Sequence, residues 1–537
     1  MKISTLRALA CCAVLMMATG VNAHNNKTFM APRPDNVNVP WWHTTFEDLV
    51  FEAKNNSCGN AWQLTGLYQE SSDRDDVGKY FLIHDKNIIK FNATKTQESD
   101  LDPTPVNTVG AMEDVDITYV INYAQAFQSE LDTINNGNYT LELKPSQQVV
   151  GVGLSYHQRF DWALSGLFFY ANAPVVAMKR GVHLTLNHSV HDDISNVRED
   201  ELYSYFAGGL VKFNFEYPPF YNAEFPPTGR GQKPLTHAKL TGSQGTAGFS
   251  DVDFGLGWAF LDRPKYHAAI AIAATIPAGN KPTGEYAFEP IRGNGGHWAL
   301  GGNLDAWYRL FKGTKQNLRV AMRAELRYLF ESHETRTLGL KNRLWGQYYL
   351  LGQSLGTAYD ADTTITQKIP AANVLTRSVD VTPGLQFDGT LSFVYTNGGW
   401  SADLGWNPYA RESEDVHMRG DFPDGIYAVA SRGFNTAREE DGEPASGEVV
   451  DHQFTISAAN VDDGNVATAT VNNSTIDVNA ARTPSQFTNA IYGSVAHMWD
   501  RGHKHATIVA LGGKYEFASE NSALEQWNVW AKMGLEF

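Results

Sequence analysis

The last twelve residues of the chain, 526–537, read QWNVWAKMGLEF, and they decide the fold. Apolar residues occupy every odd position, whereas mostly polar residues stand between them. Successive side chains of a strand point to opposite faces, so this pattern predicts a strand with one apolar face. The chain stops on an aromatic residue, and the apolar positions of the terminal strand include Trp527, Val529, Met533, Leu535 and Phe537.

The same period of two recurs upstream. In 316–330 the even positions from Leu318 to Phe330 are apolar or small, and arginines and a glutamate stand between them. Strands of 11 to 15 residues exceed the usual 5 or 6 and suit membrane-spanning strands of roughly 9–11 residues with overhang. We expect twelve strands near 146–157, 161–171, 175–187, 249–261, 265–277, 297–310, 316–330, 383–396, 399–411, 487–499, 503–517 and 526–537.

A further strand near 60–70, with a partner near 80–91 or 137–144, brings the predicted number to 14, with 12 and 16 as alternatives. In lipid every backbone donor and acceptor must pair within the protein, so the sheet must close. The sequence therefore predicts an all-β protein with a single transmembrane, antiparallel, up-and-down β-barrel. Bacterial barrels of this type have even strand numbers.

Short and long connections alternate. Tight turns are expected at Asn172-Ala173-Pro174, Asp262-Arg263-Pro264, 311–315, 396–399 and 500–502, and long loops at 71–145, 188–248, 331–382 and 412–486. This alternation is typical of an outer-membrane barrel with short periplasmic turns and long extracellular loops. If Phe537 is periplasmic, alternate strands end there on an aromatic residue suited to the interface: Trp499, Tyr395, Tyr308, Phe260 and Tyr170.

The chain resembles the outer-membrane β-barrel proteins of Gram-negative bacteria, porins among them. The ending Met533 to Phe537 is similar to the C-terminal signature that the barrel-assembly machinery recognises in that class. The stretches Asp253 to Phe260 and Ala268 to Gly279 resemble barrels that transport hydrophobic substrates, and no substrate-binding residue is carried over from them. The resemblance implies an outer-membrane location, reached through the periplasm, and contact with the bilayer and lipopolysaccharide.

The N-terminus has the three regions of a signal peptide, with basic Lys2 and Arg7, an apolar core and a small-x-small site ending at Ala23. We expect residues 1–23 to be removed, 24–59 to form a periplasmic or plug segment, and 60–537 to form the barrel with its loops. Cleavage changes the formal charge from −16 to −18 and leaves Cys58 as the remaining cysteine. A short helix over 197–206 is expected in the 188–248 loop, either constricting the pore or covering its mouth.

The acidity lies in the loops. Segment 412–486 has a net charge of −10 and segment 71–145 of −7. An acidic protein is a poor partner for nucleic acid, which is bound through basic surface. These acidic side chains either keep the loops solvated or bind Ca²⁺ that bridges them to the cell surface. Asp462 and Asp463 offer the hard oxygen ligands that Ca²⁺ prefers. His188 and His191 are candidates for a transition metal, and no cofactor is expected.

The apolar face of strand 316–330 must meet lipid, because a charge at the bilayer midplane costs roughly 2–4 kcal/mol there. The polar faces of this strand and its neighbours then line the pore. An arginine row sets the field in a lumen and guides anions; the alternative is internal neutralisation by carboxylates. The candidates for lining the pore are Arg319, Arg323, Glu325, Arg327, Asp253, Asp305 and Arg309.

Three functions are open to such a barrel. A barrel of about 14 strands is wide enough for a channel, so we expect a passive outer-membrane channel for small solutes, either a porin or an uptake transporter. The alternative is a structural protein that meets other surfaces through its acidic loops, and a barrel hydrolase is the third. The G-x-S-x-G match at Gly352 to Gly356 lies in a long loop rather than in a strand-turn-helix elbow. We therefore expect no enzyme and assign no catalytic residue.

Overall fold

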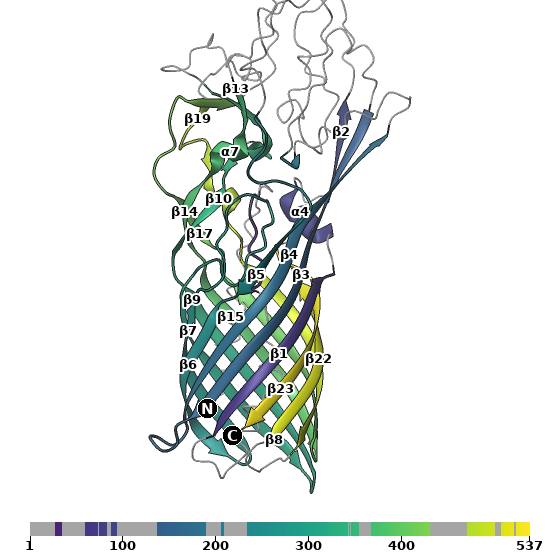
Figure 1. The fold of residues 1–537 in the computed structure, drawn as a ribbon, viewed down its shortest axis with the longest axis vertical. Helices are drawn as coiled ribbons and strands as arrows, with labels where there is room; N and C mark the ends of the chain where they lie inside the picture. Colours follow the sequence, from purple (N-terminus) through teal and green to yellow (C-terminus); the bar gives the residue numbers. More distant parts are fainter. Residues whose placement is uncertain are drawn as a thin grey trace, which may run out of the picture.

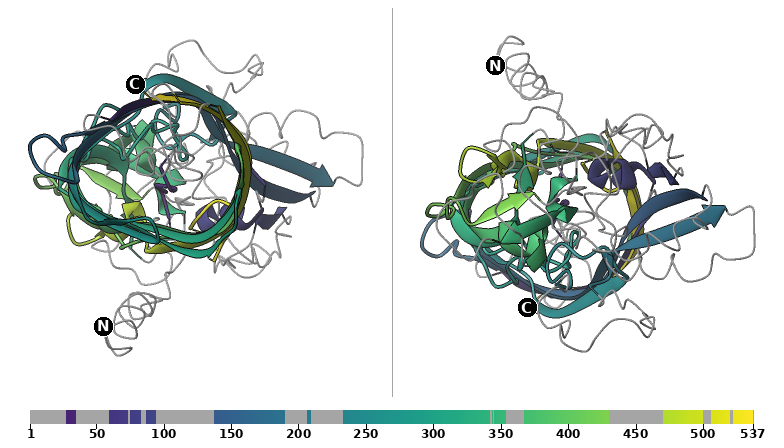
Figure 2. Two further views of the ribbon diagram at one scale, coloured as in Figure 1. Left: turned by 90° about the horizontal axis from the view of Figure 1, so that it is seen from below. Right: turned by 90° about the horizontal axis from the view of Figure 1, so that it is seen from above.

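A closed barrel forms the body of the molecule (Figures 1 and 2). The computed structural model describes residues 27–34, 59–72, 75–82, 87–93, 137–189, 206–208, 233–341, 343, 345–353, 367–429, 470–499, 506–519 and 522–536. Within these residues twelve antiparallel strands form the wall, and the first of them pairs with the last. In chain order they are β1 (Asn60–Ser71), β3 (Gly137–Arg159), β4 (Leu167–Ser189), β6 (Val252–Arg263), β7 (Tyr266–Ile276), β8 (Ala299–Lys312), β9 (Gln316–Leu329), β15 (Gly384–Asn397), β16 (Trp400–Arg411), β21 (Gln486–Trp499), β22 (Thr507–Ala518) and β23 (Gln526–Glu536).

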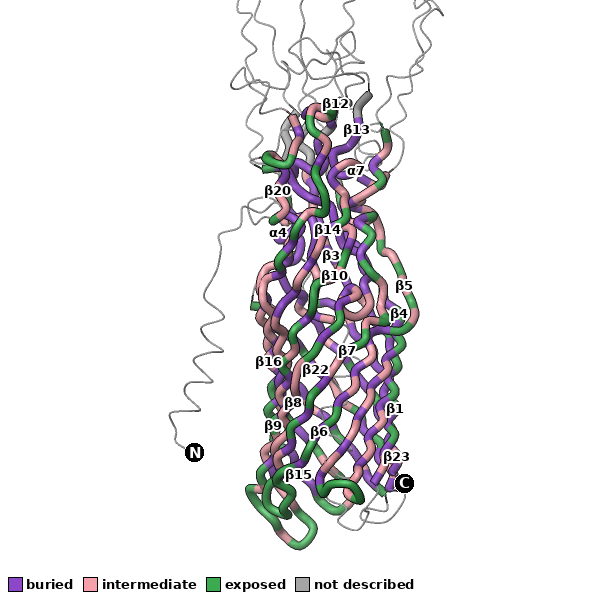
Figure 3. Tube along the Cα trace, turned by 90° about the vertical axis from the view of Figure 1, so that its left-hand side faces the viewer, coloured by how far each residue is buried: buried purple, intermediate pink, exposed green. Residues whose placement is uncertain are grey.

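The wall separates an apolar outer face from an inner face of polar and small residues. On β7, Ile270 and Ile272 are half or more exposed, whereas Ala269, Ala271 and Ala273 between them are buried. Figure 3 shows the same alternation along neighbouring strands. An exposed apolar band around a closed sheet is stable only in lipid. The predicted transmembrane β-barrel and its outer-membrane location are confirmed. Among the described residues no helix is long and apolar enough to span a bilayer.

The barrel has twelve strands, one of the alternatives considered, rather than the expected fourteen. The predicted strands 161–171 and 175–187 are one strand, β4, so the turn predicted at Asn172-Ala173-Pro174 is wrong. Proline lacks an N–H and usually ends a central strand. Pro174 is tolerated because β4 changes neighbours there, from β6 up to Asn172 to β5 (Ser243–Phe249) from Val175.

The real turn between β3 and β4 lies at 160–166. As a consequence Tyr170 does not lie at the interface; it is 1% exposed and its hydroxyl accepts a hydrogen bond from Asn303 inside the barrel. The segment 137–144, predicted as a partner of β1, is the first part of β3, but β1 pairs with the later residues 148–158 of that strand. Residues Ile88–Ala93 form β2, which pairs with the first part of β3 outside the barrel wall.

The two ends of the barrel differ as expected. At the end where β23 finishes, β6 and β7, β8 and β9, and β15 and β16 are joined by two or three residues each. The opposite end carries the long connections, so it is extracellular and the first end is periplasmic. Trp499, Tyr395, Tyr308 and Phe260 are between 41% and 49% exposed near the periplasmic end, as predicted for rings at the membrane interface.

The described parts of the long connections fold into a cap over the extracellular mouth (Figure 1). Within these parts the helices are α4 (Asp75–Phe81) and α7 (Ala371–Leu375), with 3-10 turns η3 (Gly346–Tyr348) and η5 (Val478–Ala481). Its sheets are β10 (Ser332–Thr337), β14 (Thr376–Thr382) and β17 (Asp415–Met418); β11 (Gly339–Leu340) and β20 (Ile476–Asp477); and β12 (Leu350–Gln353), β13 (Gln367–Pro370), β18 (Tyr427–Val429) and β19 (Thr470–Val471).

The cap has a hydrophobic core of its own. Trp345, Tyr348 and Phe206 meet there with ring centroids 5.1 to 5.8 Å apart, and all three are buried. The Trp345 indole donates a hydrogen bond to the carbonyl of Phe81 at 2.9 Å, which joins two distant connections. Met30, from the N-terminal segment, belongs to the same core. The cap is therefore a packed unit rather than a set of independent loops.

Candidate functional site: the lumen and its extracellular mouth

The structure places the predicted pore-lining residues on the inner face of three strands. Asp253 comes from β6, Asp305 and Arg309 from β8, and Arg319, Arg323, Glu325 and Arg327 from β9. Arg319, Arg323, Glu325 and Asp253 are less than 8% exposed. Their neighbours Met322, Leu326 and Tyr328 on the outer face are more than 40% exposed. The alternating pattern therefore assigns the two faces of these strands correctly.

Carboxylates accompany two arginines of this row, Arg323 and Arg327. Arg327 Nη1 lies 2.7 Å from Asp253 Oδ1, and Arg327 also pairs with Glu325. Arg323 Nη1 lies 3.8 Å from Asp305 Oδ2. The row is therefore not an uncompensated positive surface, and of the two readings of the arginines the contacts favour neutralisation within the wall.

Aromatic rings and cations gather near the periplasmic end of the lumen. The Arg319 and Arg309 guanidinium carbons lie 5.6 and 5.9 Å from the centroid of the Trp307 ring. The His267 ring stacks on Trp307 at 6.0 Å, and its Nδ1 lies 3.6 Å from Asp262 Oδ1. Guanidinium over a tryptophan face is a favourable contact. At this end of the lumen large side chains therefore pack against one another.

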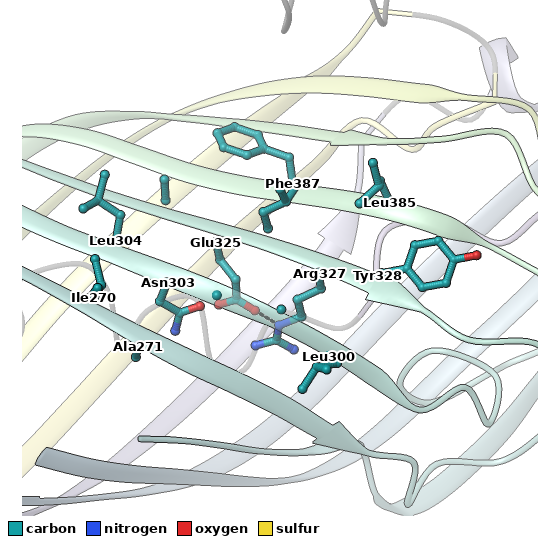
Figure 4. A pocket seen from close by; sticks show the side chains of 14 residues that line it. Ile270, Ala271, Leu300, Asn303, Leu304, Glu325, Arg327, Tyr328, Leu385 and Phe387 are labelled. Atoms are coloured by element: carbon teal, nitrogen blue, oxygen red, sulfur yellow. Dashed lines mark ion pairs between the residues drawn. The ribbon is translucent and has the colours of Figure 1, made fainter. Parts of the chain in front are cut away.

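A cavity of about 480 Å³ lies where β7, β8, β9 and β15 run side by side (Figure 4). It is lined by apolar outer-face residues such as Leu300 and Phe387 and also by polar inner-face residues, Glu325 and Arg327 among them. Gly301 and Gly302 of β8 also line it. Residues of both faces of the wall therefore border this cavity.

The N-terminal segment, residues 27–34, joins the cap to the lumen. Thr28 N donates to the carbonyl of Ala480 in η5 at 2.9 Å, and Tyr80 of α4 donates its hydroxyl to the carbonyl of Phe29 at 2.8 Å. Further along, Arg411 donates to the carbonyl of Ala31 at 3.1 Å. Figure 2 shows this dark purple segment inside the ring of strands. It therefore enters the mouth from the cap side.

Arg33 fixes the end of this segment to the wall. Its Nη1 donates to Glu516 Oε1 at 2.8 Å, and its Nη2 donates to Asp388 Oδ2 at 2.6 Å and to Asn407 Oδ1 at 3.0 Å. The guanidinium carbon lies 4.6 Å from the centroid of the Tyr409 ring. Sequence reasoning did not find Arg33, because it lies in a stretch without periodicity and its partners are hundreds of residues away.

A buried ionic cluster lies beside the segment, at the neck between barrel and cap. Arg336 of β10 lies 2.6 Å from Glu334 and 2.5 Å from Glu414, and Arg411 lies 2.8 Å from Glu414. The guanidinium carbon of Arg336 also lies 3.7 Å from the centroid of the Phe29 ring. The cluster thus holds the cap strand β10, the end of β16 with the connection that follows it, and the N-terminal segment together.

The electrostatics of the neck follow from this pairing. Burial alone would raise the pKa of the Glu414 carboxyl, but the charges of Arg336 and Arg411 and hydrogen bonds from Arg336 and Thr483 outweigh it. They hold the pKa of Glu414 well below its usual range. For Arg336 burial acts to lower the pKa, and the two glutamates more than compensate and raise it. The cluster is therefore charged at neutral pH.

Other predicted residues lie elsewhere or outside the described chain. Trp527, Val529, Met533 and Leu535 lie on the outer face of β23, whereas Phe537 is not described. Asp462, Asp463 and His191, the signal peptide, most of the acidic loop segments and nearly all of the predicted helix 197–206 also fall outside the described residues. His188 lies in β4, and its side chain is not described. Within the described chain no three His, Cys, Asp or Glu residues cluster as metal ligands.

Comparisons with known proteins give only distant likenesses among solved structures. No family model matches the chain, and no curated protein matches it. Among solved structures it is similar to an outer-membrane channel from Pseudomonas putida, with 9% identity, a TM-score of 0.34 and coverage of 89% of this chain and 96% of that chain. A FadL homologue from Pseudomonas aeruginosa gives 7% identity, a TM-score of 0.27 and coverage of 95% and 99%. At these identities and TM-scores the likeness does not bear on function.

Proposed function

We propose that the protein is a passive channel for small solutes across the outer membrane, closed at its extracellular mouth by residues 27–34. The observation that carries the proposal is the insertion of this segment, with Arg33 bound inside the barrel. The segment runs into the mouth instead of forming part of the sheet, and side-chain and backbone hydrogen bonds hold it. Breaking those bonds would free the mouth and leave the wall intact.

The width of the barrel supports the same proposal. Eight strands leave an interior that side chains fill, and wider barrels leave room for a ligand, a channel or a plug. Twelve strands here enclose a separate piece of chain as well as the side chains of the wall. A plug held by an ion-paired arginine is a suitable element for controlled opening, because such pairs lose much of their strength once water enters.

The proposal is tested by the conductance of the purified protein in planar bilayers. We expect the wild type to conduct rarely and Arg33→Ala to raise the open probability at least tenfold. Arg377→Ala is the matched control, because it removes the same charge from the cap surface, where Arg377 donates to the carbonyl of Asp421 at 3.3 Å. If correctly folded Arg33→Ala protein carries no current in these bilayers, the channel proposal is overturned.

One observation favours the alternative of a surface-interaction protein. The cap has its own hydrophobic core and ordered sheets, which is more structure than covering a pore requires. Such a packed unit on the extracellular side is a suitable scaffold for a binding surface. If folded Arg33→Ala protein never conducts, this alternative becomes the leading function, and binding of the intact cap to lipopolysaccharide or to other cells is then the measurement to make.

A further inference from the structure

The barrel wall at the extracellular mouth forms a binding site for a guanidinium group. In this structure Arg33 occupies it, bound by three wall residues from three different strands: Asp388 of β15, Asn407 of β16 and Glu516 of β22. The Tyr409 ring closes one face of the guanidinium at 4.6 Å. Two carboxylates at the edge and an aromatic ring on the face match the planar, fork-shaped arginine head group.

The wall holds these acceptors in place without help from the N-terminal segment. Glu516 accepts hydrogen bonds from Thr488 and from Gln526, the latter at 3.0 Å. Asn407 donates to the other oxygen of Asp388 at 2.7 Å. All these contacts are between strands of the barrel. The site is therefore preorganised, which lowers the cost of binding any group of the right shape.

Charge also favours a cation in this site. Asp388 and Glu516 carry two negative charges, and Lys514, which lies 3.5 Å from Glu516, supplies one positive charge. Arg33 brings the second. The side chain of Glu516 is fully buried and that of Asp388 is 15% exposed. When Arg33 withdraws, these carboxylates are left with incomplete compensation in a poorly hydrated place, which is unfavourable.

We propose that this site binds the guanidinium group of a small cationic solute that enters from the exterior, and that Arg33 is its internal competitor. The inference rests on the proposed channel function and names the class of solute that the mouth selects. A guanidinium is favoured over a simple ammonium because it can contact Asp388, Asn407 and Glu516 at once while stacking on Tyr409. An ammonium is a compact, strongly hydrated charge that lacks the planar face.

The test uses the full-length Arg33→Ala protein in planar bilayers, with methylguanidinium or methylammonium added on the extracellular side. We expect methylguanidinium to block the Arg33→Ala current in a saturable way, with at least tenfold higher apparent affinity than methylammonium. The wild type, whose site is filled, should respond at least tenfold more weakly. Arg33→Ala combined with Asp388→Asn should lose the block. Tyr409→Leu in the same background keeps every charge and should weaken it several-fold.

The outcomes separate this inference from the channel proposal. A silent but folded Arg33→Ala protein, judged by heat-modifiable migration in gels, contradicts the channel itself. An Arg33→Ala protein that conducts but is blocked equally by both cations, or by neither, leaves the channel intact and overturns the guanidinium site. If the Asp388→Asn protein does not assemble, the Tyr409→Leu variant decides: block unchanged by loss of the ring also overturns the site.

Discussion

At the scale of single residues, the charges buried at the neck between barrel and cap have a direct consequence for the stability of the cap. Glu414 is in contact with Arg336 and Arg411 and accepts a backbone hydrogen bond from Thr483 at 3.0 Å. Removing one member of a buried ion pair is strongly destabilising, because it leaves the partner charge uncompensated. Glu414 therefore links the stability of the cap to pH.

The sign of this dependence follows from the depressed pKa of Glu414. The stabilisation is complete above the ordinary carboxyl value of 4.5 and is lost as the pH falls from there toward the folded-state pKa. We expect the cap to melt at progressively lower temperature below about pH 4.5. Near-ultraviolet circular dichroism, which reports on packed rings such as Trp345 and Tyr348, measures this melting at pH 7, 5 and 3.

Glu414→Gln isolates the contribution of this one group. At pH 7 the variant cap should be less stable by about 3 kcal/mol. Its deficit relative to the wild type should shrink as the pH falls below about 4.5, because the unfolded wild-type chain then takes up a proton at this carboxyl and the folded protein does not. A deficit that stays constant from pH 7 to pH 3 would show that the pKa of Glu414 is not depressed in the folded protein.

At the scale of strands, the same pairing of an aromatic residue with a glycine recurs on the inner face of the barrel. Large aromatic side chains lie against glycines directly opposite them on the neighbouring strand, so that the rings lie flat on the wall: Tyr170 on Gly255, Phe168 on Gly257, Tyr492 on Gly405 and Trp530 on Gly512. Glycine destabilises a strand, and a cross-strand ring compensates by covering its backbone. These pairs connect neighbouring strands on the lumen side.

Gly512→Val tests this pairing. A Cβ at Gly512 would lie 2.4 Å from the Trp530 ring, so the ring must move off the wall. We expect a loss of about 1–3 kcal/mol, as for other overpacked sites, measured as a lower temperature for loss of the heat-modifiable folded band. Gly66→Val is the matched control, because a Cβ there meets nothing within 4 Å. Equal losses in the two variants would mean that strand propensity, not the ring contact, sets the effect.

At the scale of the whole molecule, the local sequence pattern predicts the strands of the barrel wall. It does not predict which segment and which contacts lie inside the barrel. The strand at 316–330 was predictable because lipid on one side and polar lumen on the other impose a period of two over its whole length. The turn at Asn397-Gly398 was predictable for a similar local reason, since Gly398 has a φ of 61°. Both signals lie within a few residues of one another in the chain.

What the sequence did not reveal depends on distant partners. Pro174 looked like a turn, because its tolerance depends on which strand lies beside it. Arg33 was missed, since its partners stand 355 to 483 residues further along the chain. The inward-facing charges of β9 were identified, and their neutralisation by carboxylates such as Asp253 and Asp305 was one of two interpretations left open, because the choice depends on contacts between strands. The order of the wall strands follows the chain, as in any up-and-down barrel, but no single segment specifies which side chains meet inside it.

The last prediction concerns the orientation of the whole barrel in the membrane. If the long connections are extracellular, a cysteine at Asp424, on the exposed part of the cap, should react on intact cells with a membrane-impermeant maleimide. One at Thr314, in the short turn between β8 and β9, should react only after the outer membrane is permeabilised. Both belong in a Cys58→Ser background, and equal labelling in detergent is the control for reactivity. Labelling of Thr314→Cys but not of Asp424→Cys on intact cells would show that the barrel has the opposite orientation, with the Arg33 site at the periplasmic mouth.

The guanidinium solute would then have to be added from the opposite side. This labelling result therefore also decides from which side the channel experiments must be made.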